Sequence, residues 1–155
     1  MQELIPTFGK TTDSYETEYM TDITCDVHCT SYGFIKDGRI QGFFFSERYI
    51  ELPYVSPELF YVAGIQDGGY EDWLILRIKN ERSKIELQGN PRPDVLVERD
   101  NEDRIVFFGM QRDGKPHGLG LSIEHAPGVT KTPHFGLWQN GVKTHAFKDG
   151  ELCPI

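Results

Sequence analysis

Four pairs of glycines limit the folds open to this 155-residue chain more than any other feature, because the second glycine of each pair lies in a turn sequence. The pairs are Gly33/Gly38, Gly64/Gly69, Gly109/Gly114 and Gly136/Gly141. Asp-Gly or Asn-Gly between apolar runs is a strong hairpin signal, since both central residues of a type I′ turn need positive φ. The pattern predicts an all-β chain built as a meander of antiparallel β-hairpins.

The segments between these turns are short and rich in β-branched and aromatic residues, which favours strands. Predicted strands cover residues 14–20, 24–35, 39–47, 50–52, 59–65, 72–79, 84–88, 95–98, 105–111, 118–124, 134–139 and 143–147. The best helix start is Ser56-Pro57-Glu58, which predicts at most a turn or two through Tyr61. Residues 1–13 are predicted to be a lead-in segment that lies over the surface or pairs as an edge strand.

Length and composition predict a single domain, residues 1–155, around one core, with 38% hydrophobic residues to fill it. The formal charge is -8, and no segment concentrates Lys or Arg, so nucleic acid and anionic membrane surfaces are not expected partners. The N-terminal segment has neither the basic start nor the apolar run of a signal peptide or a membrane span. These features predict a cytoplasmic protein and leave its oligomeric state open.

The three cysteines do not form a disulfide framework, because their number is odd. Alternation along residues 23–29 places Cys25, Val27 and Cys29 on one side of a strand, which predicts buried thiols. A zinc site from Cys25, His28 and Cys29 is the alternative, but His28 points to the opposite face and no second pair stands at a ligand spacing. We therefore predict no metal site and no cofactor.

One segment resembles a known repeat family. Residues 108–121 read FGMQRDGKPHGLGL, and their glycines at 109, 114, 118 and 120 match every glycine of the MORN repeat pattern. Residues 32–42 match three of the four, with Phe44 where the last glycine would stand. The resemblance implies a curved sheet of stacked hairpins. However, the first glycines of the four pairs are 31, 45 and 27 residues apart, whereas a solenoid needs near-constant units.

The alternative all-β architecture is an antiparallel meander that closes into a lipocalin-like barrel. Closure would remove exposed strand edges. An apolar run such as Gly42-Phe-Phe-Phe45 at such an edge would otherwise promote pairing with other chains. A small closed barrel can hold one small ligand in its interior. The curved sheet and the barrel therefore differ in whether the protein has an internal pocket.

Histidines concentrate in the last quarter of the chain, which contains four of the five. If consecutive hairpins pair, His117 and His134 approach one another near one end of the sheet, and Glu124 is available to orient an imidazole. This would be a general acid/base site for proton transfer. The alternative is that these histidines pack beside turns and have no chemical role.

Aromatic residues recur at or beside the glycine pairs. They are Tyr32, Phe34, Phe44, Tyr61, Phe108, Phe135 and Trp138. A glycine opposite a ring leaves room for the ring to lie flat on the sheet, so core packing is one interpretation. If the rings line a concave face, they form a binding surface for a protein partner or an apolar small molecule.

Two functions remain open on the sequence alone. The first is a non-enzymatic interaction module that presents an aromatic face of a hairpin sheet to a protein partner. The second is a small barrel enzyme, an isomerase or cyclase, that binds an apolar small molecule and uses His117 or His134 with Glu124. Such an enzyme gains most of its rate from holding the substrate in a reactive shape, so it needs no recognisable motif.

Overall fold

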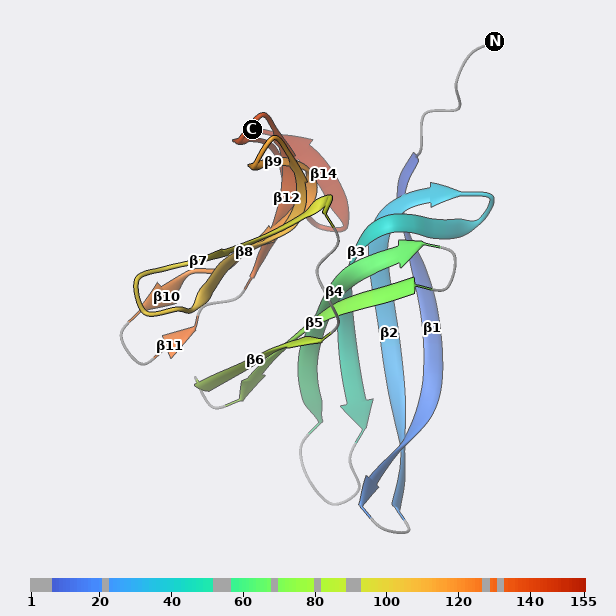
Figure 1. Ribbon diagram of the computed structural model, residues 1–155. Coiled ribbons are helices and arrows are strands. Elements are labelled where there is room, and N and C mark those ends of the chain that lie inside the picture. The colour runs from blue at the N-terminus through green and yellow to red at the C-terminus, as the bar shows by residue number, and fades with distance from the viewer. Residues whose placement is uncertain are drawn as a thin grey trace.

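The computed structural model describes residues 7–20, 23–51, 57–67, 70–79, 82–88, 93–126, 129–130 and 133–155, arranged as in Figure 1. Within these ranges the regular secondary structure is β-strand, and the strands pair antiparallel. The prediction of an all-β fold of antiparallel hairpins is therefore confirmed. The same ranges contain no helix that could cross a membrane.

The first sheet is a six-stranded meander in which each strand pairs with the next one in the chain. Its strands are β1 (Thr7–Met20), β2 (Ile23–Lys36), β3 (Arg39–Glu51), β4 (Glu58–Asp67), β5 (Tyr70–Lys79) and β6 (Arg82–Gln88). Residues 7–13 of the predicted lead-in belong to β1, which pairs with β2 as an edge strand. The edge-strand alternative is thus confirmed for these residues, and residues 1–6 lie outside the described ranges.

The second sheet repeats this plan with six strands in sequential order. Its strands are β7 (Val95–Arg99), β8 (Ile105–Arg112), β9 (Lys115–Ser122), β12 (His134–Gln139), β13 (Val142–Lys148) and β14 (Glu151–Pro154). A separate two-stranded hairpin, β10 (His125–Ala126) and β11 (Val129–Thr130), lies in the connection between β9 and β12.

Two local predictions are wrong. The helical turn through Tyr61 does not form, because Glu58–Asp67 is strand β4, paired with β3 on one side and β5 on the other. Pairing along both edges overrides the local Ser-Pro-Glu helix signal. The break predicted between residues 47 and 50 is also absent, since β3 runs from Arg39 to Glu51 along β2.

The closed-barrel alternative is wrong as well, because neither sheet closes on itself in the part of the chain that the structure describes. The end strands β1 and β6 each pair with one neighbour, and so do β7 and β14. The sheets instead curve and lie against one another, with β1 beside β14 and β6 beside β11 (Figure 1). The curved-sheet alternative agrees with this arrangement, while the resemblance to the MORN family stays a prediction.

The predicted tight turns have the backbone that their sequences require. Positive φ occurs at both residues of Asp37-Gly38 (54° and 77°), Asp113-Gly114 (54° and 76°) and Asn140-Gly141 (50° and 86°). Each pair joins two neighbouring strands as a type I′ hairpin turn does. The turn predicted at Gly69 includes positions outside the described residues.

The two sheets share one register at their glycines. In each sheet, three residues on neighbouring central strands face one another, and we call each set of three a glycine row. The rows are Gly33, Phe44 and Gly64 in the first sheet and Gly109, Gly120 and Gly136 in the second. Both hairpins also shift register at the same place, just after Gly33 and just after Gly109. This arrangement explains why the four glycine pairs are unevenly spaced along the chain. Two pairs belong to the first sheet and two to the second, so the longest interval separates the sheets.

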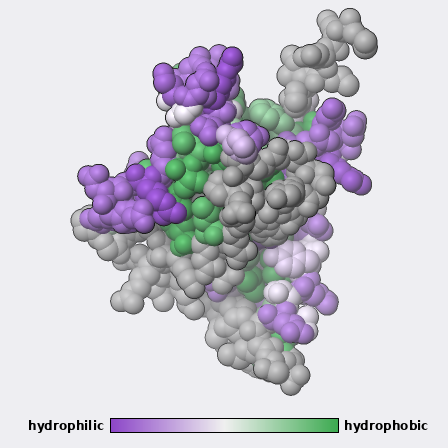
Figure 2. All heavy atoms as spheres, in the orientation of Figure 1, coloured by the Kyte–Doolittle hydropathy of each residue, from purple (hydrophilic) through white to green (hydrophobic). Residues whose placement is uncertain are grey.

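The main core fills the space between the two sheets. It includes Phe43, Phe45 and Ala63 from the first sheet and Phe108 and Leu121 from the second. On the face that Figure 2 shows, hydrophobic residues gather near the centre of the view, with hydrophilic residues above them and to their left. A second cluster, which includes Val27, Phe44 and Val62, lies on the opposite face of β2–β4, because strand residues alternate between faces.

Candidate binding groove

The aromatic residues predicted as a binding face are mostly buried. Five of them belong to the core between the sheets or pack against it: Tyr32, Phe108 and Phe135 are buried, and Phe34 and Tyr61 are half-buried against them. Phe44 belongs to the second cluster on the outer face of the first sheet. Trp138 packs on the outer face of the second sheet, with its ring 5.1 Å from the ring of Phe107. These positions match core packing, and the described chain does not bring the seven residues together on one surface.

The register separates the predicted catalytic residues. Strand β12 pairs with β9 so that His134 faces Ser122 and Trp138 faces Gly118. His117 and His134 therefore lie at opposite ends of this pairing. His117 accepts a hydrogen bond at Nδ1 from the backbone N–H of Asn140 (3.1 Å), and Glu124 is exposed just beyond β9. A shared acid/base role of these residues stays a prediction.

The cysteine prediction is confirmed in its main part. Cys25, Val27 and Cys29 are buried on one face of β2, whereas His28 is exposed on the other face, 3.5 Å from the Glu51 carboxylate. The described residues contain no group of three or more potential metal ligands. Cys153, on β14, is half-buried.

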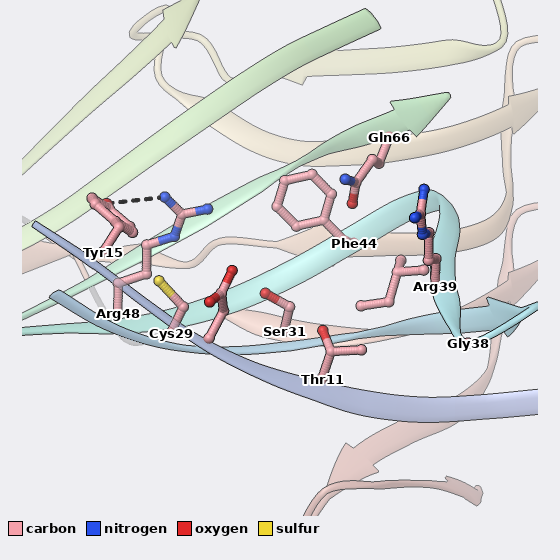
Figure 3. A pocket seen from close by; sticks show the side chains of 11 residues that line it. Thr11, Tyr15, Cys29, Ser31, Gly38, Arg39, Phe44, Arg48 and Gln66 are labelled. Atoms are coloured by element: carbon pink, nitrogen blue, oxygen red, sulfur yellow. Dashed lines mark hydrogen bonds between the residues drawn. The ribbon is translucent and has the colours of Figure 1, made fainter. Parts of the chain in front are cut away.

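An open groove of about 280 Å³ lies on the outer face of the first sheet, over β1–β4. We call it the β1–β4 groove. It is lined by Thr11, Asp13, Tyr15, Cys29, Ser31, Gly38, Arg39, Ile40, Phe44, Arg48 and Gln66. Figure 3 shows Arg48 and Tyr15 at one end and Arg39 at the other, with Phe44 and Gln66 along one wall and Ser31 and Thr11 along the opposite wall.

A hydrogen-bonded chain holds one guanidinium in place at the groove. Ser31 donates to the hydroxyl of Ser46 (3.0 Å), which is completely buried beneath. Arg48 donates from Nε to the same hydroxyl (3.3 Å) and from Nη1 to the hydroxyl of Tyr15 (3.2 Å). The Arg48 guanidinium also lies 5.7 Å from the centre of the Tyr15 ring. These contacts fix a planar cation beside Ser31, as recognition of an anion requires.

The groove carries positive charge on a negative protein. Its charged residues are two arginines, Arg39 and Arg48, and one carboxylate, Asp13, in a chain with a formal charge of -8. The Asp13 carboxylate accepts a hydrogen bond from the backbone N–H of Ser14 (2.8 Å). Among these three residues, positive charge exceeds negative charge by one.

Cys29 lies between these charges on the neighbouring strands, because Asp13 and Arg48 both face it in the sheet. Burial raises the pKa of the Cys29 thiol, the positive charge of Arg48 opposes this shift, and the negative charge of Asp13 adds to it. The raised pKa keeps the thiol protonated near neutral pH, so Cys29 lacks the thiolate that a nucleophile needs.

A second depression of about 300 Å³ lies between β6 and the turn that connects β7 to β8. His125 is on its wall, and Nε2 of this residue is 2.8 Å from the carbonyl oxygen of Ile105. Exposed Arg99 and Asp103 form part of the same wall and pair with each other at 3.8 Å. Arg104, on the same wall, pairs with Asp100 at 2.9 Å, so both arginines of the depression are paired with carboxylates. The depression is therefore a weaker candidate for a ligand site than the β1–β4 groove.

Sequence reasoning missed the β1–β4 groove, because Ser31, Gln66 and Arg48 belong to no motif. The available signal was a comparison of residues 31–44 with residues 107–120, where aligned Asp-Gly turns place Ser31 against Phe107.

Comparison of the chain with models of known protein families, with curated proteins and with solved structures gave no match.

Proposed function

We propose that this chain is a non-enzymatic binding module that receives its ligand in the β1–β4 groove. The observation that carries the proposal is a concave surface where polar groups converge: a fixed guanidinium at Arg48, the hydroxyls of Ser31 and Tyr15, and a second guanidinium at Arg39. A few convergent polar groups beside apolar walls are typical of ligand sites. Phe44 and Ile40 supply the apolar walls here.

The filled interior supports this choice over the enclosed site of a barrel enzyme. Aromatic rings from both sheets meet between them, as in the pair Phe45 and Phe135, whose ring centres are 5.2 Å apart. The proposal keeps a non-enzymatic binding role, but it replaces the aromatic face and the protein partner of the sequence-based hypothesis with the groove and a ligand that fits it. An isomerase or cyclase that uses His117 or His134 is the weaker alternative, because neither residue lines the groove.

A screen of small fragments by nitrogen-15 NMR tests the proposal. Bound fragments are expected to shift the backbone amides of Thr11, Ser31 and Gln66, and to be recovered unchanged after long incubation. Arg48→Ala should weaken the binding of anionic fragments about tenfold or more, since a hydrogen bond to a charged group contributes about 1.5–3 kcal/mol.

Arg112→Ala is the matched control, because Arg112 is an exposed arginine at the end of β8, outside the groove. This variant should bind fragments as the unmodified protein does. The proposal fails if no fragment perturbs groove amides, or if Arg48→Ala and Arg112→Ala behave alike. Conversion of a bound fragment into a product would instead favour an enzyme.

A further inference from the structure

The two sheets differ at equivalent positions on their outer faces. The shared register aligns Ser31 with Phe107, because both lie two residues before the first glycine of their row and face a serine on the next strand. It also aligns Gln66 with Trp138, because both face the bulge glycine of the preceding hairpin, Gly42 or Gly118. The second sheet thus has two aromatic rings where the first has two short or polar side chains.

In the second sheet, these rings cover the glycine row. A methyl group added at Gly120 would lie 2.7 Å from Cζ of Phe107 and 3.4 Å from the Trp138 ring. Phe107 and Trp138 are 5% and 8% exposed, and their rings meet edge to face at 5.1 Å. Lys143 completes this arrangement, with its ammonium 5.3 Å from the Trp138 ring. On the outer face of the second sheet, the protein's own aromatic rings thus lie on the surface that the glycines leave open.

In the first sheet the equivalent space is only partly filled. Phe44 replaces the central glycine of the row and covers part of the surface. Ser31 and Gln66 leave the space beside the Phe44 ring open, and all three residues line the groove (Figure 3). A planar ring in this space would lie where Phe107 and Trp138 lie in the other sheet. Contact with the Phe44 ring favours an aromatic group, through offset or edge-to-face packing.

The charge beside this space specifies a second feature of the ligand. Ser31 and Arg48 both donate hydrogen bonds to the Ser46 hydroxyl, so the guanidinium lies next to the Ser31 position. An acidic group on the ring would reach Arg48 and gain a charge-assisted hydrogen bond.

We propose that the β1–β4 groove binds a small planar aromatic carboxylate. Its ring occupies the space that Ser31 and Gln66 leave beside Phe44, and its carboxylate pairs with Arg48. This inference rests on the proposed function and names the ligand class of the same groove. The positive charge of the groove and its correspondence to the ring-covered face of the second sheet carry it together.

The test titrates the full chain with 2-naphthoate and two close analogues, followed by NMR. Decahydro-2-naphthoate keeps the acid but lacks aromatic rings, and it should bind about two- to tenfold more weakly. The neutral 2-naphthamide keeps the rings and should bind about tenfold more weakly or worse. Equal binding of either analogue would overturn the inference.

A double variant transfers the second sheet's rings to the groove. Ser31→Phe with Gln66→Trp should abolish saturable 2-naphthoate binding, because the new side chains occupy the ligand's place. The control is Ser14→Phe with Gln41→Trp, which makes the same exchanges at exposed strand positions outside the groove and should bind 2-naphthoate normally. Retained binding in the first variant, or equal loss in both, would contradict the proposal.

A charge series at Gln66 gives a result even if the double variant does not fold. Gln66 is exposed, so Gln66→Glu and Gln66→Lys should both fold, and the first should weaken and the second strengthen 2-naphthoate binding. The absence of this opposite pair of effects would count against the carboxylate. If fragments other than aromatic acids perturb the groove while 2-naphthoate does not, this inference alone fails. If no fragment does, the proposed function fails too.

Discussion

At the scale of single residues, the groove shows how a strand neighbourhood sets the chemistry of one side chain. Cys29 is 7% exposed and lies between a carboxylate and a guanidinium in the sheet. The two charges act in opposite directions on its pKa, and burial, the largest cause, raises it. The side chain therefore behaves as a small apolar wall of the groove rather than as a nucleophile.

We predict that native protein reacts with an alkylating reagent first at Cys153. This thiol is half-buried on the edge strand β14, whereas Cys25 and Cys29 are buried. Mass spectrometry after iodoacetamide treatment near neutral pH should show one modified thiol, and Cys153→Ser should remove it. Raising the pH should increase labelling of Cys29 only above the ordinary thiol range, because its pKa is raised. Rapid labelling of Cys153→Ser at neutral pH would contradict the burial argument.

At the scale of elements, the hairpins could be predicted from the sequence because their determinants are local. Asp37-Gly38 and Asn140-Gly141 specify positive φ whatever surrounds them, and the structure confirms it. Closure of the sheet could not be predicted, since it depends on whether distant strands such as β1 and β6 meet. The groove was missed for a similar reason: Ser31 becomes informative only when the register aligns it with Phe107.

The glycine rows lead to a graded prediction. A methyl group at Gly109 would lie 2.5 Å from Cα of Gly120 and 2.9 Å from the carbonyl oxygen of Leu119, so the backbone must move. We expect Gly109→Ala to destabilise the protein by about 1–3 kcal/mol. At Gly9 the near atom is the flexible end of Ile35, at 2.7 Å, and Gly9→Ala should cost less than about 1 kcal/mol.

Urea unfolding of both variants provides the measurement. The two changes insert the same methyl group in equivalent meanders, so the difference in their unfolding midpoints isolates the close strand approach in the second sheet. Equal midpoints for Gly109→Ala and Gly9→Ala would mean that the β8–β9 backbone adjusts freely. The ring cover over the second glycine row would then be looser than the contacts indicate.

At the scale of the whole molecule, the two meanders depend on a common core. Rings from β1, β3, β12 and β13 meet at Phe135, whose ring lies 6.0 Å from Phe8, 5.2 Å from Phe45 and 5.4 Å from Phe147. Each sheet alone would expose its half of this surface to water. Burial of apolar area is the main favourable contribution to folding, so separation of the sheets would be costly.

Phe135→Ala is therefore expected to weaken both sheets together. The loss of a buried phenylalanine costs about 3–5 kcal/mol, because the ring's transfer energy is lost and a cavity remains. Native-state hydrogen exchange should show a similar loss of protection for central amides of β2–β3 and of β8–β9.

Val142→Ala is the control: Val142 is 65% exposed on the second sheet, and its loss should change stability by less than about 0.5 kcal/mol. If Phe135→Ala lowered protection in the second sheet alone, the first sheet would be stable without its partner. Its own outer cluster around Val27, Phe44 and Val62, beneath the β1–β4 groove, would then be the part of the structure that maintains it.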